Sequence, residues 1–153
     1  MVWLGCAHTN PDYPDRTAAT DMLTYGKDAI KAIGFSTIKL YLTSGYATDY
    51  PGQAFGSVPT TLTTLAQTTP MAACLADAQF TRYLLTSYTF ANGLNSPYND
   101  LTAANLSSEY TEVYNLAVHL LSTYSNKEFI LQNAEGDWEL LGGTNDHMEV
   151  DPI

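Results

Sequence analysis

Basic residues are scarce in this sequence: its 153 residues include six Lys and Arg against 16 Asp and Glu, for a formal net charge of -10. Nucleic-acid binding requires several Lys or Arg side chains to neutralise phosphates, and attraction to an anionic membrane surface requires clustered positive charge as well. We therefore expect neither nucleic acid nor a membrane as a partner. A neutral polymer such as a polysaccharide would not be repelled by the acidic surface.

Several other signals of function are missing. No apolar run approaches the roughly 18 residues of a membrane span, and the N-terminus lacks the basic region and apolar run of a signal peptide. The two cysteines, Cys6 and Cys74, have no metal-ligand spacing, and the three histidines are scattered along the chain. No dinucleotide-binding glycine motif, P-loop or nucleophile elbow is present. We predict no metal and no cofactor, and the localisation stays unknown.

What the sequence does contain is a recurring pattern of apolar run, polar loop and helical spacing, with 45% hydrophobic residues to form a core. The apolar runs predict strands near residues 2–7, 36–43, 82–90 and 128–133. Strands that alternate with helices favour right-handed crossovers and a parallel sheet. The sequence therefore predicts a single α/β domain made of four strand–helix units.

Four such units fit two architectures. One is a parallel (βα)4 half of a TIM-type (β/α)8 barrel, a fold that typically needs about 250 residues. The other is a small open α/β sandwich. We favour the half-barrel, as a fragment, because no helical pattern follows the fourth strand and a parallel sheet normally has both faces covered. A sequential strand order with helices on one face would indicate the half-barrel, and a shuffled order with helices on both faces the sandwich.

Two patterns predict which side chains face the core. In the second strand, Ile38, Leu40 and Leu42 form the face that helices would cover, whereas Lys39, Tyr41 and Thr43 share the opposite face. The clearest helix has an apolar stripe that we expect to face the core, and Asn105 or Ser107 is placed to cap it. The stripe consists of Tyr110, Val113, Tyr114, Ala117, Leu120, Leu121 and Tyr124.

The end of the fourth strand carries the most informative residues. Because strand side chains alternate between faces, Asn133 and Glu135 share the face of Phe129 and Leu131. A carboxyl group can protonate a glycosidic oxygen, and a neighbouring amide can hydrogen-bond to a sugar hydroxyl. Trp138, three residues further on, offers a flat surface on which a sugar ring can stack. A carboxyl group, an amide and an indole close together are therefore suited to binding and cleaving a carbohydrate.

The strand–helix order and the pair Asn133 and Glu135 resemble retaining glycoside hydrolases of the (β/α)8 superfamily. In that superfamily the general acid/base glutamate ends strand four directly after an asparagine, and the nucleophile glutamate ends strand seven. In this sequence Ala134 stands between the two residues. The resemblance implies that Glu135 is the general acid/base, that the nucleophile belongs to a missing C-terminal half-barrel, and that this fragment alone is inactive.

Further candidates for substrate binding lie at the strand ends: Asn133, Trp138, Asp137, His8, Tyr41 and Asn92. The loops after the strands of a barrel meet at one rim, so we expect His8, Tyr41 and Asn92 to converge there with Asn133 and Glu135. Each type of residue also has a structural interpretation: a hydrogen-bonded histidine, a turn asparagine, a capping or solvent-facing carboxylate, a core tryptophan. The alternative function is a non-catalytic α/β module that binds a carbohydrate or a protein.

Overall fold

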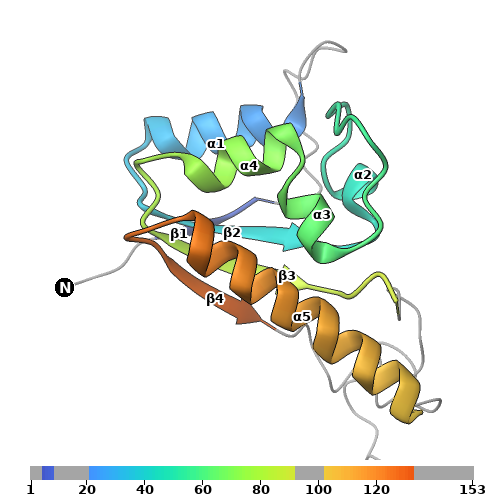
Figure 1. Cartoon of the computed structure of the whole chain (residues 1–153). Helices are drawn as coiled ribbons and strands as arrows, with labels where there is room; N and C mark the ends of the chain where they lie inside the picture. Colours follow the sequence, from blue (N-terminus) through green and yellow to red (C-terminus); the bar gives the residue numbers. More distant parts are fainter. Residues whose placement is uncertain (1–4, 9–20, 92–101, 133–153) are drawn as a thin grey trace, which may run out of the picture.

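The structure, a computed structural model, describes residues 5–8, 21–91 and 102–132. Its centre is a four-stranded sheet in which all neighbouring strands are parallel (Figure 1). The strands are β1 (Gly5–Ala7), β2 (Thr37–Leu42), β3 (Arg82–Ser87) and β4 (Glu128–Gln132). Each lies within the range that the sequence predicts. The predicted α/β class with a parallel sheet is confirmed.

The strand order is sequential, β1-β2-β3-β4. The helices are α1 (Met22–Ala32), α2 (Tyr46–Asp49), α3 (Leu62–Ala66), α4 (Thr69–Ala76) and α5 (Ala103–Thr123). All but the short α2 contribute buried side chains to one hydrophobic core, which also contains the inward residues of β2 and β3. In the described part of the chain the helices therefore cover one face of the sheet. The shuffled order of an open sandwich is not seen among the described strands.

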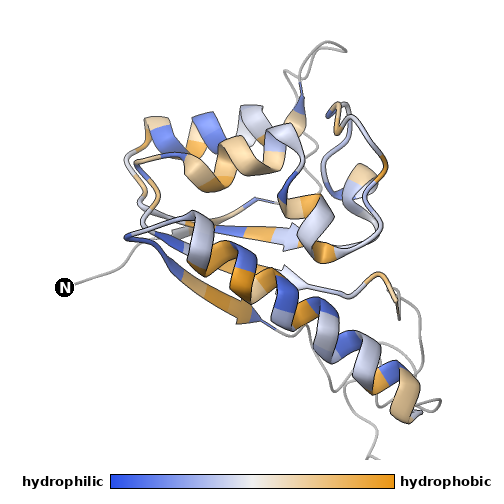
Figure 2. Cartoon of the chain, viewed as in Figure 1, coloured by the Kyte–Doolittle hydropathy of each residue, from blue (hydrophilic) through white to orange (hydrophobic). Residues whose placement is uncertain are grey.

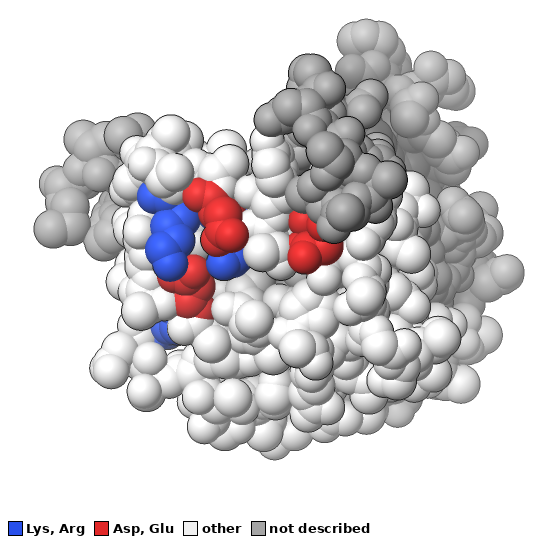
Figure 3. Space-filling model, turned by 90° about the horizontal axis from the view of Figure 1, so that it is seen from above, with Lys and Arg blue, Asp and Glu red and all other residues white. Residues whose placement is uncertain are grey.

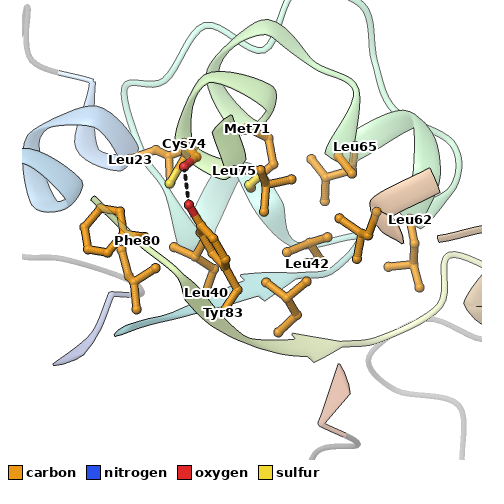
Figure 4. Close-up of a cluster of buried hydrophobic side chains, with 14 of the residues drawn as sticks. Leu23, Leu40, Leu42, Leu62, Leu65, Met71, Cys74, Leu75, Phe80 and Tyr83 are labelled. Carbon is orange, nitrogen blue, oxygen red and sulfur yellow. Dashed lines mark hydrogen bonds between the residues drawn. The ribbon is translucent and has the colours of Figure 1, made fainter. Parts of the chain in front are cut away.

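The core lies between the sheet and α1, α3, α4 and α5. Ile38, Leu40 and Leu42 are fully buried in it, as the alternation in the second strand predicts. Tyr83 of β3 is buried beside them, and its hydroxyl donates a hydrogen bond to the carbonyl of Cys74 at 2.9 Å (Figure 4). Burial raises the pKa of the Cys74 thiol to about 12, which makes this cysteine an inert core residue.

The ends of the helices carry residues that are typical of helix caps. The side chain of Asp21 caps α1 by accepting a hydrogen bond from the amide of Thr24 at 2.8 Å. Gly34 follows α1 with a φ of 88°, the left-handed conformation expected of a glycine at this point. Thr61 and Thr64 form a reciprocal capping box at the start of α3. These local signals fix where the crossovers begin and end.

The orientation of α5 differs from the prediction. Its buried residues are Glu112, Leu116 and Leu120, and Thr102 is the residue that caps it. Tyr110 and Leu121, which were expected to face the core, are 69% and 71% exposed. The physical reason is that Glu112 finds hydrogen-bond donors inside the protein and takes a core position. The helix is thereby rotated, and hydrophobic residues lie on its outer side (Figure 2).

Ion pairs gather at the amino end of the sheet, the end opposite the expected site. Asp77, at the end of α4, accepts hydrogen bonds from Lys31, and Lys27 lies 3.4 Å away. Burial raises the pKa of Asp77, but these contacts outweigh it and hold the pKa below its ordinary value. Lys127 donates to the carbonyls of Asp77 and Phe80 at 2.7 Å. Figure 3 shows the basic side chains of this face in one group mixed with acidic ones.

Candidate functional site at the carboxyl edge of the sheet

The carboxyl ends of all four strands lie at one edge of the sheet because the strands are parallel. Ligands of parallel α/β proteins bind outside this edge. The register sets Tyr41, Thr86 and Gln132 side by side across β2, β3 and β4. The loops that follow these strands start directly beyond them. This edge is the place where the predicted site residues were expected to meet.

His8 directly follows β1, and its side chain is 1% exposed. The ring nitrogen Nε2 donates a hydrogen bond to the carbonyl of Leu23 in α1 at 3.1 Å. The ring lies so close to α1 that a Cβ atom built on Gly26 would overlap it. Burial lowers the pKa of His8 although the contacts to backbone carbonyls favour the charged form. His8 therefore joins β1 to α1 as a neutral histidine on the helix-covered face.

Tyr41 lies on the other face of the sheet. Its neighbours Leu40 and Leu42 are in the core, and the Nζ atom of Lys39 stands 5.5 Å from the centre of its ring. The pairing of Ala7 with Lys39 puts His8 level with Leu40, which is why His8 shares the core face instead. The structure thus does not bring the side chains of His8 and Tyr41 together. The remaining predicted residues lie outside the described part of the chain: Asn92, Asn133, Glu135, Asp137 and Trp138.

The face of the sheet that holds Tyr41 has no helix over it among the described elements. On this face Lys39, Leu84 and Ile130 lie side by side across β2, β3 and β4. Tyr41, Thr86 and Gln132 form the next row toward the carboxyl edge, and we call this row the polar level. Ile130 of the edge strand β4 is 41% exposed. In a closed barrel this face would point inward and fill the interior in layers. The polar level lies nearest to the carboxyl edge.

Tyr50 shapes the junction of β1 and β2 at this edge. The amide of His8 pairs with the carbonyl of Lys39, and a regular parallel ladder would next join the amide of Tyr41 to the carbonyl of His8. Instead, the Tyr50 hydroxyl accepts from the Tyr41 amide at 2.8 Å and donates to the His8 carbonyl at 3.0 Å. Burial raises the pKa of Tyr50 well above its ordinary value, so the hydroxyl keeps its proton. The inserted hydroxyl therefore separates the two strand ends.

We expect Tyr50→Phe to destabilise the fold by about 2 kcal/mol, because a buried amide and a buried carbonyl lose their partner. Tyr41→Phe is the matched control: no hydrogen bond of its hydroxyl is seen among the described residues, so the change should stay within about 0.5 kcal/mol. Urea unfolding of both variants measures the difference. Equal stability of the two variants would show that the inserted hydroxyl does not hold this junction together.

The loop after β2 brings further groups to the edge that sequence reasoning missed. Thr43 donates a hydrogen bond to the carboxylate of Asp49 at 2.6 Å. Burial raises the pKa of Asp49, although this hydrogen bond opposes the shift. The ring centre of Tyr46 lies 4.7 Å from that of Phe55 and 6.4 Å from that of Phe90 in the loop after β3. The aromatic richness of this loop was the signal in the sequence, but it did not identify Asp49.

Glu112 holds the start of the loop after β3. Its carboxylate accepts hydrogen bonds from the amides of Phe90 and Ala91 at 3.1 and 2.8 Å. A third hydrogen bond, at 3.2 Å, comes from the amide of Leu62 at the start of α3. Glu112 thus joins α5, α3 and the segment that leads to Asn92. No spacing or motif marks this residue in the sequence.

The described residues contain neither a cluster of metal ligands nor a membrane-spanning helix. No group of three or more His, Cys, Asp or Glu side chains is placed there to hold a metal ion, and no helix of that part of the chain is long and apolar enough to cross a membrane. The chain matches no protein-family model, no curated protein and no solved structure. The resemblance to glycoside hydrolases therefore rests on the residues of the chain itself.

Proposed function

We propose that this chain is the N-terminal half of a glycoside hydrolase-like (β/α)8 barrel that acts on a carbohydrate, with Glu135 as the general acid/base. The observation that carries the proposal is the sequential, all-parallel strand order with the helices on one face. An open sandwich that binds at a switch point requires the strand order to reverse, and the described strands contain no reversal. Four sequential strands are half of the eight in a closed parallel barrel.

The end of β4 defines what the assignment of Glu135 requires. The strand ends at Gln132, and Asn133 and Glu135 follow directly in the sequence. The polar level of Tyr41 and Thr86 stands next to Gln132 on the uncovered face. By the alternation of strand side chains, Asn133 and Glu135 continue the row of Phe129 and Leu131, which packs against the core on the helix-covered face. The proposal therefore requires the chain to turn after Gln132, so that the Glu135 carboxyl group meets a sugar beside these hydroxyl and amide groups. Retaining hydrolysis needs a second carboxyl about 5–5.5 Å away, which the completing half of the barrel would supply.

Kinetics of Glu135→Gln test the proposal in the barrel that contains this chain and its completing half. For alkyl glycosides, whose leaving groups need a proton, we expect kcat/KM to fall roughly a hundredfold, the lower end of what general acid–base catalysis contributes. Dinitrophenyl groups leave without protonation, so kcat/KM for these glycosides should fall much less, although hydrolysis of the glycosyl-enzyme is slowed for both substrates. The 153-residue monomer alone should hydrolyse neither substrate because it lacks the second carboxyl.

Asp137→Asn is the matched control for this experiment. As a substrate-binding residue it should raise KM and leave the dependence on the leaving group unchanged. If Glu135→Gln reduced kcat/KM of both substrates equally, or had no effect on either, Glu135 would not be the general acid/base. The alternative of a non-catalytic protein-binding module would then gain weight, since the outer side of α5 exposes hydrophobic residues.

A further inference from the structure

The helical layer has exposed apolar side chains at both of its ends. With about 100° per residue in an α-helix, the side of α5 that turns away from α3 carries Tyr110, Tyr114, Ala117 and Leu121. We call these four residues the α5 flank. Glu112, which contacts Leu62 of α3, lies on the opposite side of the helix axis from them. The α5 flank contains no charged residue.

The α5 flank lies on the side of β4. Tyr124, which follows α5 on the same side of the helix as Ala117, packs against Phe129 of β4 with ring centres 6.1 Å apart. β4 itself pairs only with β3 among the described strands, so no described strand covers its outer edge. An edge of this kind is a template for another strand. The edge of β4 and the α5 flank thus form one border that no described strand or helix covers.

The opposite end of the layer has a matching border. β1 pairs only with β2 among the described strands. The side of α1 that turns away from α4 carries Ala29, Ala32 and Ile33, all exposed, and Ile33 is 69% exposed. Lys27 and Lys31 point the other way, since they contact Asp77 beyond α4, whereas Asp28 lies one turn before Ala32 at the border of this side. We call Ala29, Ala32 and Ile33 the α1 flank.

We infer that two copies of the 153-residue chain by itself associate with twofold symmetry, the second copy taking the place of the completing half. The β4 edge and α5 flank of each copy meet the β1 edge and α1 flank of the other. Two sets of four sequential parallel strands make the eight of a closed barrel, which leaves no free edge. A twofold axis along the barrel creates both junctions at once and keeps all strands parallel. The residues of the two flanks are uncharged, and the neighbouring Asp28 is paired with Lys27 at 2.6 Å, so copies with a net charge of -10 can approach there. The inference rests on the proposed half-barrel architecture and not on the chemistry of Glu135.

Sedimentation velocity over a concentration series tests this with the 153-residue chain. We expect a dimer of twice 16.7 kDa that dissociates on dilution. Leu121→Lys on the α5 flank and Ile33→Glu on the α1 flank should each raise the dissociation constant roughly a hundredfold, as for residues at the centre of an interface. Asn115→Glu, on the polar side of α5, should change it less than about threefold. Circular dichroism melting checks that all three variants fold.

Mixing the Leu121→Lys and Ile33→Glu variants separates this arrangement from other dimers. In a mixed dimer one junction pairs the introduced lysine with the introduced glutamate and the other junction is wild type, so association should return to near the wild-type level. A monomer at all concentrations, or a dimer that Leu121→Lys breaks and Ile33→Glu does not, would overturn the inference. Either result would leave the kinetic test of Glu135 unaffected, so failure of this pairing and failure of the proposed chemistry remain distinguishable.

Discussion

Replacing Glu112 with leucine is expected to destabilise the folded chain by about 3–5 kcal/mol, because three backbone amides lose a charged acceptor in a buried place. The amides belong to Leu62, Phe90 and Ala91. Leucine fills a similar volume but accepts no hydrogen bond, so the amides stay unsatisfied and α3 separates from the loop after β3. The loss is measured as a shift of the urea unfolding curve with an unchanged slope.

Two comparisons make this test specific. Glu112→Gln keeps one carbonyl oxygen as an acceptor. We therefore expect it to lower the free energy of unfolding by roughly 1–2 kcal/mol, which is less than Glu112→Leu does. Glu109→Gln, the same change one turn earlier in α5 and on a less buried side chain, should cost less than about 1 kcal/mol. A Glu112→Leu variant as stable as the Glu109→Gln variant would contradict a bracing role for this carboxylate.

Gly26→Ala is expected to cost about 3 kcal/mol, although alanine is the better helix former by about 1 kcal/mol. The added Cβ overlaps the His8 ring, so the ring must move and its hydrogen bond to Leu23 is lost. Overpacking of a closed site typically costs about 1–3 kcal/mol, and a buried polar group left without its partner costs a similar amount. Thermal or urea unfolding of the purified variant measures the sum.

A double-mutant cycle assigns this cost to one contact. In a His8→Ala background the ring is gone, so Gly26→Ala should be neutral or should stabilise by up to about 1 kcal/mol. The coupling free energy between the two positions would then be about 3–4 kcal/mol, at or just above the upper end for residues in contact. Simple additivity of the two substitutions would refute a direct clash between this ring and α1.

The strand–helix order was predictable because each unit carries its own local signals. The β-branched and aromatic run of β2 predicts a strand, and the left-handed conformation at Gly34 agrees with its position after α1. The alternation along β2 also predicts which face the helices cover. Such features depend on neighbours within a few residues, so one sequence suffices to find them.

The placement of His8 and the rotation of α5 were not predictable in the same way. The face on which His8 lies depends on the register of β1 against β2, and a shift by one residue reverses it. The rotation of α5 depends on amides 21 to 50 residues away in sequence that satisfy Glu112. A hydrophobic pattern ranks glutamate as exposed, and only the tertiary contacts reverse that ranking.

The most direct test of a carbohydrate site at the carboxyl edge is a titration of the ¹⁵N-labelled chain with neutral oligosaccharides, followed through its backbone amides. We expect saturable shifts at residues 41–45 and 87–91 and at the residues that follow Gln132, because these segments begin at the carboxyl ends of β2, β3 and β4. Amides of the ion-pair group around Lys27 and Asp77, at the far end of the sheet, should not shift. Shifts confined to that far end, or none with any neutral sugar, would contradict a carbohydrate site at this edge.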